Sequence, residues 1–226
     1  MTKGTGQTAA SDSDTWVFRA FPNAYLETDV PRKKSLVETL LASLAIVGVG
    51  CLGLVILLLS AFTTEYSPIT QVASDYGVGA YAAEMNAGFL LAGVGTISLA
   101  VAGLLGMEGR SARAGSALFF PAGAALLLNA FYETDVEGAA QTFHGTVHGL
   151  AGVVFFITAP VALLLVARGL GGKRFSLTVL AVALGVGSLV VDTAMALDAA
   201  GLAKRIMILV VFSCMILTAL TILREA

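Results

Sequence analysis

The sequence predicts an all-α membrane protein, a polytopic bundle of six transmembrane helices with both termini in the cytoplasm. Of its 226 residues, 57% are hydrophobic and only 12% are charged, whereas about a quarter of the residues in an average soluble domain are charged. The mean hydropathy is +0.88. The chain also holds 25 glycines, which suit lipid-embedded helices because small residues let neighbouring backbones approach closely. This composition excludes an ordinary soluble enzyme.

The first three predicted spans lie in the N-terminal half of the chain. A hydrocarbon core about 30 Å thick needs about 20 helical residues, each rising about 1.5 Å. Val37 to Phe62 meets this length and is free of charge from Leu44 to Leu59. Tyr81 to Leu105 carries Glu84 and Asn86 near its start, and the shorter run Ala114 to Phe131 contains Pro121.

Three further spans are predicted in the C-terminal half. Phe143 to Ala167 opens with two histidines and contains Pro160, Phe175 to Leu197 has Asp192 inside it, and the sixth span runs from Ile206 to Leu223. The breaks between spans are too short for a second domain. Residues 37–226 are therefore expected to form one transmembrane domain, preceded by a largely disordered cytoplasmic tail over residues 1–36 that lacks the pattern of a cleaved signal.

The distribution of basic residues predicts the orientation in the cell membrane, because Lys and Arg favour the cytoplasmic side. With the N-terminus inside, only Lys204 and Arg205 of the 13 basic residues fall outside. The acidic loop Glu133 to Glu137 then faces out. The other basic residues are cytoplasmic: Lys3, Arg19, Arg32, Lys33, Lys34, Arg110, Arg113, Arg168, Lys173, Arg174 and Arg224.

Charge and cysteine usage exclude further classes. A net charge of −2 gives nucleic acid little to bind, so no nucleic-acid partner is expected. Cys51 and Cys214 both lie inside apolar runs, so neither a disulfide framework nor a cysteine zinc site is indicated.

Polar residues gather toward one side of the predicted membrane domain. An ionisable group inside a bilayer costs at least a few kcal/mol and is by default a functional candidate. Under the predicted topology the polar and ionisable side chains occupy the outer loops and outer helix ends, while the inner halves of most spans contain few of them. The pattern predicts an outward-facing polar cavity, with these candidate residues: Ser67, Asp75, Glu84, Asn86, Asn129, Asp135, His144, His148 and Asp192.

The two histidines stand four positions apart, which places His144 and His148 on one face of a helix. This spacing suits two ligands of a zinc or similar ion, with a water in the open position and a third ligand from Asp135 or from Asp75, Glu84 or Asp192. Water bound to such an ion could attack an ester or amide. In the alternative interpretation, each imidazole packs the bundle by bonding to a neighbouring carboxylate or carbonyl.

Several short motifs outside and inside the predicted spans form a recognisable set: Ser67-Pro-Ile-Thr70, Ser74-Asp-Tyr-Gly77, Asn86-Ala-Gly88, Gly93, Phe131, Thr134-Asp135, His144, His148 and Pro160. By these motifs the chain resembles an uncharacterised membrane family, the domain of unknown function nine-nine-eight. A fainter similarity is to the six-span family of autophagy modulators and a lipid-anchor remodelling factor, which implies a connection with membrane lipids. No established catalytic residues come with either resemblance.

Three functional hypotheses remain open on the sequence. The leading one is a multi-pass protein that binds or handles a membrane lipid or other amphiphile in the outward-facing polar cavity. The second is a metal-dependent membrane hydrolase or transferase that uses His144, His148 and an aspartate. The third is a non-catalytic scaffold or accessory subunit, in which the polar residues only hold helices together.

Overall fold

The computed structural model describes residues 35–135, 138–170 and 199–224. The predicted tail over residues 1–36 lies outside them except for its last two residues. The predicted fifth span, with Asp192, also lies outside. Within the described ranges the fold is all helical, and no strand occurs there. The predicted fold class is confirmed to this extent.

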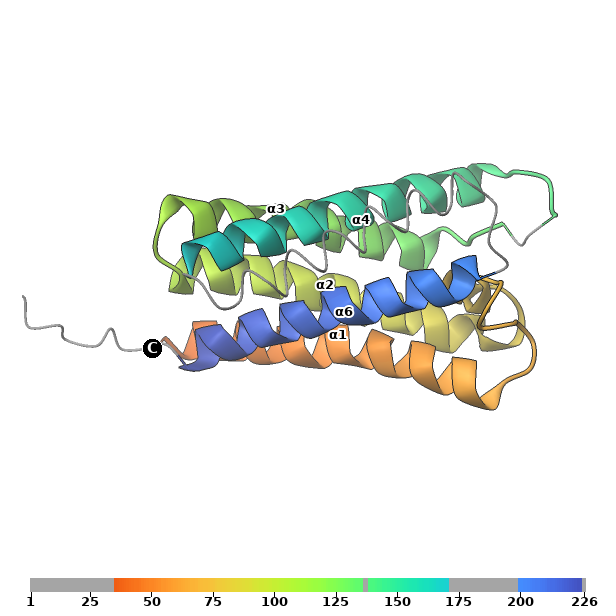
Figure 1. Cartoon of the computed structure of the whole chain (residues 1–226), viewed down its shortest axis with the longest axis horizontal. Coiled ribbons are helices and arrows are strands. Elements are labelled where there is room, and N and C mark those ends of the chain that lie inside the picture. Colours follow the sequence, from red (N-terminus) through yellow and green to blue (C-terminus); the bar gives the residue numbers. More distant parts are fainter. Residues whose placement is uncertain (1–34, 136–137, 171–198, 225–226) are drawn as a thin grey trace, which may run out of the picture. The chain divides into compact units, whose positions relative to one another are not determined.

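Five long helices cover most of the described chain (Figure 1). Each is long and apolar enough to cross a membrane, so the chain is a multi-pass membrane protein. Two short 3₁₀ helices, η2 (Ala73–Gly77) and η3 (Gly79–Tyr81), lie in the connection between α1 and α2. The long helices are α1 (Leu36–Phe62), α2 (Ala82–Gly106), α3 (Arg110–Phe131), α4 (Phe143–Gly169) and α6 (Ala200–Arg224).

Local hydrogen bonds and one glycine define several helix ends. The Ser35 hydroxyl accepts from the Glu38 amide at 3.1 Å and caps α1, and the Thr142 hydroxyl caps α4 by accepting from the Gly145 amide at 3.0 Å. Between α2 and α3, Gly109 has φ +84°. Glycine adopts this left-handed conformation at little cost, which permits the tight connection.

Two helices begin earlier than the sequence predicts. The third begins at Arg110 rather than Ala114, and the sixth begins at Ala200 rather than Ile206. The prediction started each span at its first uncharged run, but basic residues near a helix end do not interrupt the helix. In α6 the extra turn and a half carries Lys204 and Arg205, and the second of these is buried.

Small residues let consecutive helices pack closely. A Cβ on Gly95 of α2 would lie only 3.1 Å from the Cα of Gly48 in α1, and one on Gly115 of α3 would overlap the Ala162 carbonyl of α4. The helices α1 to α4 pack consecutively, and α6 packs mainly against α1. These glycines have the packing role that the composition indicates.

The bundle has two different ends. We call one the loop end, where residues 63–81 connect α1 to α2 and residues 132–142 follow α3. The Leu202 amide near the start of α6 donates to the Ile69 carbonyl at 3.0 Å, so α6 also begins there. We call the other the turn end, where residues 107–109 join α2 to α3. The Ser111 hydroxyl donates there to the Leu165 carbonyl at 2.8 Å, so α4 approaches its end at the turn end.

Candidate functional site

A cavity of about 230 Å³ lies in the loop-end half of the bundle, and we call it the loop-end cavity. All five long helices and both loops contribute to its wall. Ile56, Phe155 and Phe212 form part of the apolar wall deeper in the bundle. Its polar lining side chains come from the loops and the helix ends: Ser74, Asn129, Thr134, His148 and Lys204. The cavity is therefore polar toward the loops and apolar toward the bundle centre.

Asn129 supplies the least satisfied polar group of this wall. It lies in the last turn of α3 and is 5% exposed. Its Oδ1 atom is fully buried and has no hydrogen-bond partner among the described residues. Leaving a buried acceptor unsatisfied costs about 1–3 kcal/mol. The atom therefore requires a donor that the described protein does not provide.

His148 is buried and its tautomer follows from one hydrogen bond. Nδ1 lies 2.8 Å from the Tyr132 carbonyl oxygen, and since a carbonyl only accepts, Nδ1 carries the proton. In the neutral ring Nε2 is then an acceptor. The edge of Phe89 meets the ring at a centroid distance of 5.9 Å and fixes its position. This carbonyl bond is the packing role that the sequence left open as an alternative to metal binding.

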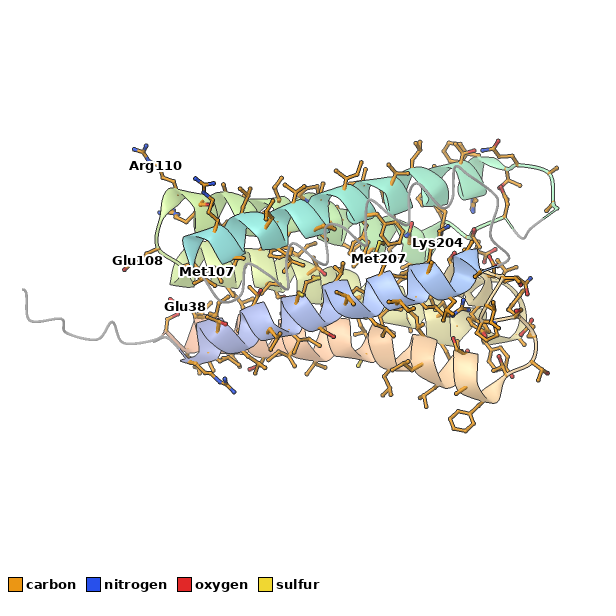
Figure 2. All side chains as sticks on the ribbon, viewed as in Figure 1. Glu38, Met107, Glu108, Arg110, Lys204 and Met207 are labelled. Carbon is orange, nitrogen blue, oxygen red and sulfur yellow. The ribbon has the colours of Figure 1, made fainter. Side chains whose placement is uncertain are left out.

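Lys204 also lines this cavity, although it is not among the cavity residues that the sequence predicts. Figure 2 shows it on the side of α6 that faces α4. Ile208 and Phe212 follow at spacings of four and eight residues and also line the cavity. This helical spacing was the signal that could have assigned Lys204 to the inner face of α6.

Arg205, which is not among the predicted site residues either, ties α6 to the connection between α1 and α2. It is 5% exposed, and its Nη1 donates to the carbonyls of Pro68 at 2.9 Å and Gln71 at 2.5 Å. Its Nε donates to the Ser60 hydroxyl at 2.9 Å. The guanidinium also lies 5.8 Å from the centre of the buried Tyr76 ring. These contacts set the rotation of α6 and hence the direction of Lys204.

Four other predicted site residues lie at the loop end but do not line this cavity. The exposed Ser67 accepts from the Thr70 amide at 3.3 Å and stabilises a turn. The Asn86 amide donates to the Gly77 carbonyl at 3.4 Å and holds η2 against α2. Asp75 is buried within η2, and Glu84 is exposed at the start of α2. The hydrogen bonds of Ser67 and Asn86 stabilise the connection between α1 and α2.

Asp135 belongs to the connection between α3 and α4, and His144 lies in the first turn of α4. The two Asp135 carboxylate oxygens accept from the Thr142 amide and hydroxyl, each at 2.8 Å. The hydrogen bond from the Thr142 amide, followed by that from its hydroxyl, holds the pKa of Asp135 below its usual range. His144 is exposed, with its ring centroid 5.3 Å from that of Tyr132. Neither residue lines the loop-end cavity.

Comparison with known proteins identifies the family. The family described as "Protein of unknown function (DUF998)" matches residues 46–221. The chain belongs to the DUF998 family. The match extends from α1 into α6 and confirms the resemblance that the sequence motifs indicate. No curated protein and no solved structure matches the chain. The similarity of this DUF998 protein to the autophagy-modulator family stays a prediction.

The described part of this DUF998 protein does not bring the predicted zinc ligands together. Its residues contain no group of three His, Cys, Asp or Glu side chains placed to hold a metal ion. Asp135 is engaged with Thr142, and His148 uses Nδ1 for Tyr132. The zinc hypothesis therefore has no support from this geometry and stays a hypothesis. The geometry instead brings Asn129 and His148 together in one wall, with Lys204 opposite them on α6.

Proposed function

We propose that this protein binds an amphiphile, a membrane lipid or a related molecule, with the polar part of the ligand in the loop-end cavity. The observation that carries the proposal is the wall of the loop-end cavity, which is polar toward the loops and apolar toward the bundle centre. One residue of this wall, Asn129, keeps its Oδ1 atom buried without a partner in the described chain. The apolar floor favours a ligand with an apolar portion.

The size of the cavity limits how much of the ligand enters it. At about 30 Å³ for each water in the liquid, 230 Å³ corresponds to about eight waters. This space suits a head group with a few methylene groups, or a small amphiphile. The acyl chains of a two-chain lipid would remain outside, against the apolar exposed surfaces of the helices.

The proposal includes six spans in the cell membrane, with both termini in the cytoplasm and the loop end outside. Two observations support this topology. α4 ends at the turn end and α6 begins at the loop end, as a crossing between them requires. Arg110 and Arg113 at the start of α3, with Arg168 near the end of α4, gather at the turn end, which favours that end as the cytoplasmic one.

Lipid analysis of purified protein tests the binding proposal. We expect mass spectrometry of detergent-purified protein to find a lipid retained at close to one per chain, and Asn129→Leu to reduce its retention. Asn86→Leu is the matched control, because Asn86 lies at the same end but outside the cavity wall. Folded wild-type protein that retains no lipid would contradict the proposal and favour the scaffold hypothesis.

Reporter fusions test the topology. Reporters placed after Arg110 and after Arg174 should be active in the cytoplasm, whereas one placed between Glu133 and Glu137 should be active outside. Opposite results at any two of these sites would overturn the proposed orientation. Zinc analysis of the same purified protein tests the hydrolase hypothesis separately. About one mole of zinc per mole of folded wild-type protein, falling to zero in His148→Gln, would favour that hypothesis.

A further inference from the structure

We infer that the groove between α4 and α6 is the docking surface of the predicted fifth span, Phe175 to Leu197, with Asp192 of that span opposite Lys204 of α6. We call this surface the α4/α6 groove. The inference rests on the topology in the proposed function, in which the chain crosses the membrane between α4 and α6. It adds the surface against which that crossing packs and the charged residue that it meets there.

The α4/α6 groove is the least packed side of the described bundle. The pairs α1 and α2, α2 and α3, and α3 and α4 pack closely, and α6 packs mainly against α1, whereas α4 and α6 make few contacts with each other. A cavity lies between them at both ends of the bundle. Val153 and Ile208 line the loop-end cavity from the two helices, and Leu163 and Leu217 line a second cavity near the turn end. These apolar side chains suit contact with another membrane helix.

The length and the end points of the intervening chain match this groove. α4 ends at Gly169 at the turn end, and α6 begins at Ala200 at the loop end. A helix from Phe175 to Leu197 rises about 35 Å, enough to cross a hydrocarbon core of about 30 Å. The three residue steps from Leu197 to Ala200 reach at most about 11 Å. The end of the span must therefore lie beside the start of α6, and its beginning follows shortly after the end of α4.

The charges of the span and of the groove are complementary at the same depth. Figure 2 shows Lys204 on the side of α6 that faces α4. It lies about 6 Å along the helix from Ala200, and Asp192 lies about 8 Å from Leu197 in the predicted antiparallel span. Opposite charges attract strongly in surroundings less polarisable than water, and pairing lowers the cost of a carboxylate within a membrane span.

Small residues share the predicted helix face that carries Asp192. Ser188, Gly185 and Ala181 precede it by 4, 7 and 11 positions, a spacing that places them on one side of a helix. Small residues allow close contact between membrane helices. The same spacing of four residues separates Lys204 from Ile208, so the register that pairs Asp192 with Lys204 also places Ser188 opposite Ile208.

Cysteine cross-linking of the full-length protein in membranes tests the docking and its register. We expect Ser188→Cys with Ile208→Cys to form a disulfide on mild oxidation with copper phenanthroline. Because Cys51 and Cys214 are free thiols, the background carries Cys51→Ala and Cys214→Ala.

The matched control for the cross-link is Ser188→Cys with Ile206→Cys. Ile206 is exposed and lies on the opposite side of α6 from Lys204 and Ile208. The yield of cross-linked protein should be at least about fivefold lower for the control pair, because its two thiols face away from each other. Equal yields for the two pairs, or no cross-link between positions 188 and 208, would overturn the inference.

A double-mutant comparison tests the pairing of Asp192 with Lys204. Asp192→Asn and Lys204→Gln should each lower the equilibrium constant for folding in detergent about fivefold, the effect of about one net hydrogen bond. The double variant should lose little more than either single variant, because the same interaction is removed only once. Asp198→Asn, which follows the predicted span, is the matched control, and its effect should multiply with that of Lys204→Gln. Multiplying effects of Asp192→Asn and Lys204→Gln would overturn the inference.

Reporter fusions separate a failure of this inference from a failure of the proposed function. A reporter after Arg174 that is active inside and one after Asp198 that is active outside would establish the crossing, so a missing cross-link would then overturn the docking alone. Reporters active on the same side at both positions would contradict the crossing, and with it both the proposed topology and this inference. Lipid retention by the wild type tests amphiphile binding in either case.

Discussion

Two cavities of nearly equal volume differ in how their polar groups are satisfied. The second, of about 220 Å³, lies between α4 and α6 near the turn end. Its polar lining includes Thr218 and Thr221, whose hydroxyls donate to the carbonyls of Cys214 and Leu217 within α6 at 2.9 and 2.8 Å. In the loop-end cavity, Asn129 Oδ1 has no such partner. The two cavities therefore resemble each other in volume but differ in that a residue of the loop-end wall holds a buried acceptor without a partner in the described chain.

The two ends of the bundle are also held by different means. At the turn end, helices approach closely through small residues, and a Cβ on Gly169 would overlap Ala112. At the loop end, where Gly201 also packs against Gln71, side chains in addition reach into the longer connections, as Arg205 does toward Pro68 and Asp135 toward Thr142. The following predictions test that difference.

The largest effect is expected from removing the Arg205 side-chain contacts. Arg205→Met leaves the Pro68 and Gln71 carbonyls without their donor, and hydrogen bonds to charged groups are worth about 1.5–3 kcal/mol each. We expect the free energy of unfolding to fall by about 3 kcal/mol or more. Chemical unfolding in detergent measures it. As the control, Arg224→Met at the exposed end of α6 should lower the free energy of unfolding by less than about 0.5 kcal/mol. Equal losses in Arg205→Met and Arg224→Met would contradict the proposed difference between the loop end and the turn end.

The next largest effect is expected at Gly145. A Cβ there would collide with the Asp135 carboxylate, so Gly145→Ala must displace that side chain from Thr142. Overpacking of this kind costs about 1–3 kcal/mol, and we expect a loss of about 2 kcal/mol in the free energy of unfolding. Gly149→Ala, one turn further along α4, meets open space and should be neutral or stabilising by up to about 1 kcal/mol.

Gly149 also lines the loop-end cavity, so its alanine variant narrows the site without disturbing the fold. Lipid retention should therefore fall in Gly149→Ala while the free energy of unfolding does not. Unchanged retention would argue that the ligand does not occupy this part of the cavity.

A smaller effect of opposite sign is expected at Asn129. Asn129→Leu removes an unsatisfied buried acceptor in a similar volume, so lipid-free protein should gain about 1 kcal/mol in unfolding free energy. Thr218→Val at the second cavity removes a hydroxyl that is already satisfied and should change stability by less than that amount. A clear loss of stability in Asn129→Leu would show that the amide holds helices together, as the scaffold hypothesis requires.

The smallest effect concerns pH and the connection between α3 and α4. The Thr142 hydrogen bonds lower the pKa of Asp135 in the folded protein, so its carboxylate stabilises this connection fully above the ordinary Asp pKa of about 4. The contribution is lost as the pH falls through the lower, folded-state pKa. Unfolding midpoints measured between neutral pH and about pH 3 should drop less steeply in Asp135→Asn than in the wild type. Parallel profiles would indicate that the two hydrogen bonds add nothing measurable.

The sequence predicted the helices better than it predicted the site. Apolar runs identify a span because each residue contributes to hydropathy independently of its neighbours in space, and all five described spans follow from this signal. Asn129 and His148 were predicted as cavity residues because a polar side chain inside an apolar membrane helix faces the bundle interior or a cavity rather than lipid. Lys204 and Arg205 were not predicted as site residues, because hydropathy does not report which face of a helix a charge occupies.

Local contacts explain why other predicted site residues do not line the cavity. Asp135 is engaged by Thr142, seven positions later, and Asn86 is engaged by Gly77, nine positions earlier. Such contacts depend on the path of an irregular connection, which no periodic pattern encodes. The sequence therefore located the polar end of the bundle but not the subset of residues that shares a cavity there.

The contacts of Arg205 also set an order of events during biogenesis. The residues that Arg205 joins are separated from it by 134 to 145 positions along the chain. The connection between α1 and α2 must wait for its donor until α6 has been synthesised and inserted, and contacts so distant in sequence form late. A nascent chain released before α6 would expose the Pro68 and Gln71 carbonyls unpaired. Arg205 thus makes the hydrogen bonding of the first connection dependent on the insertion of α6.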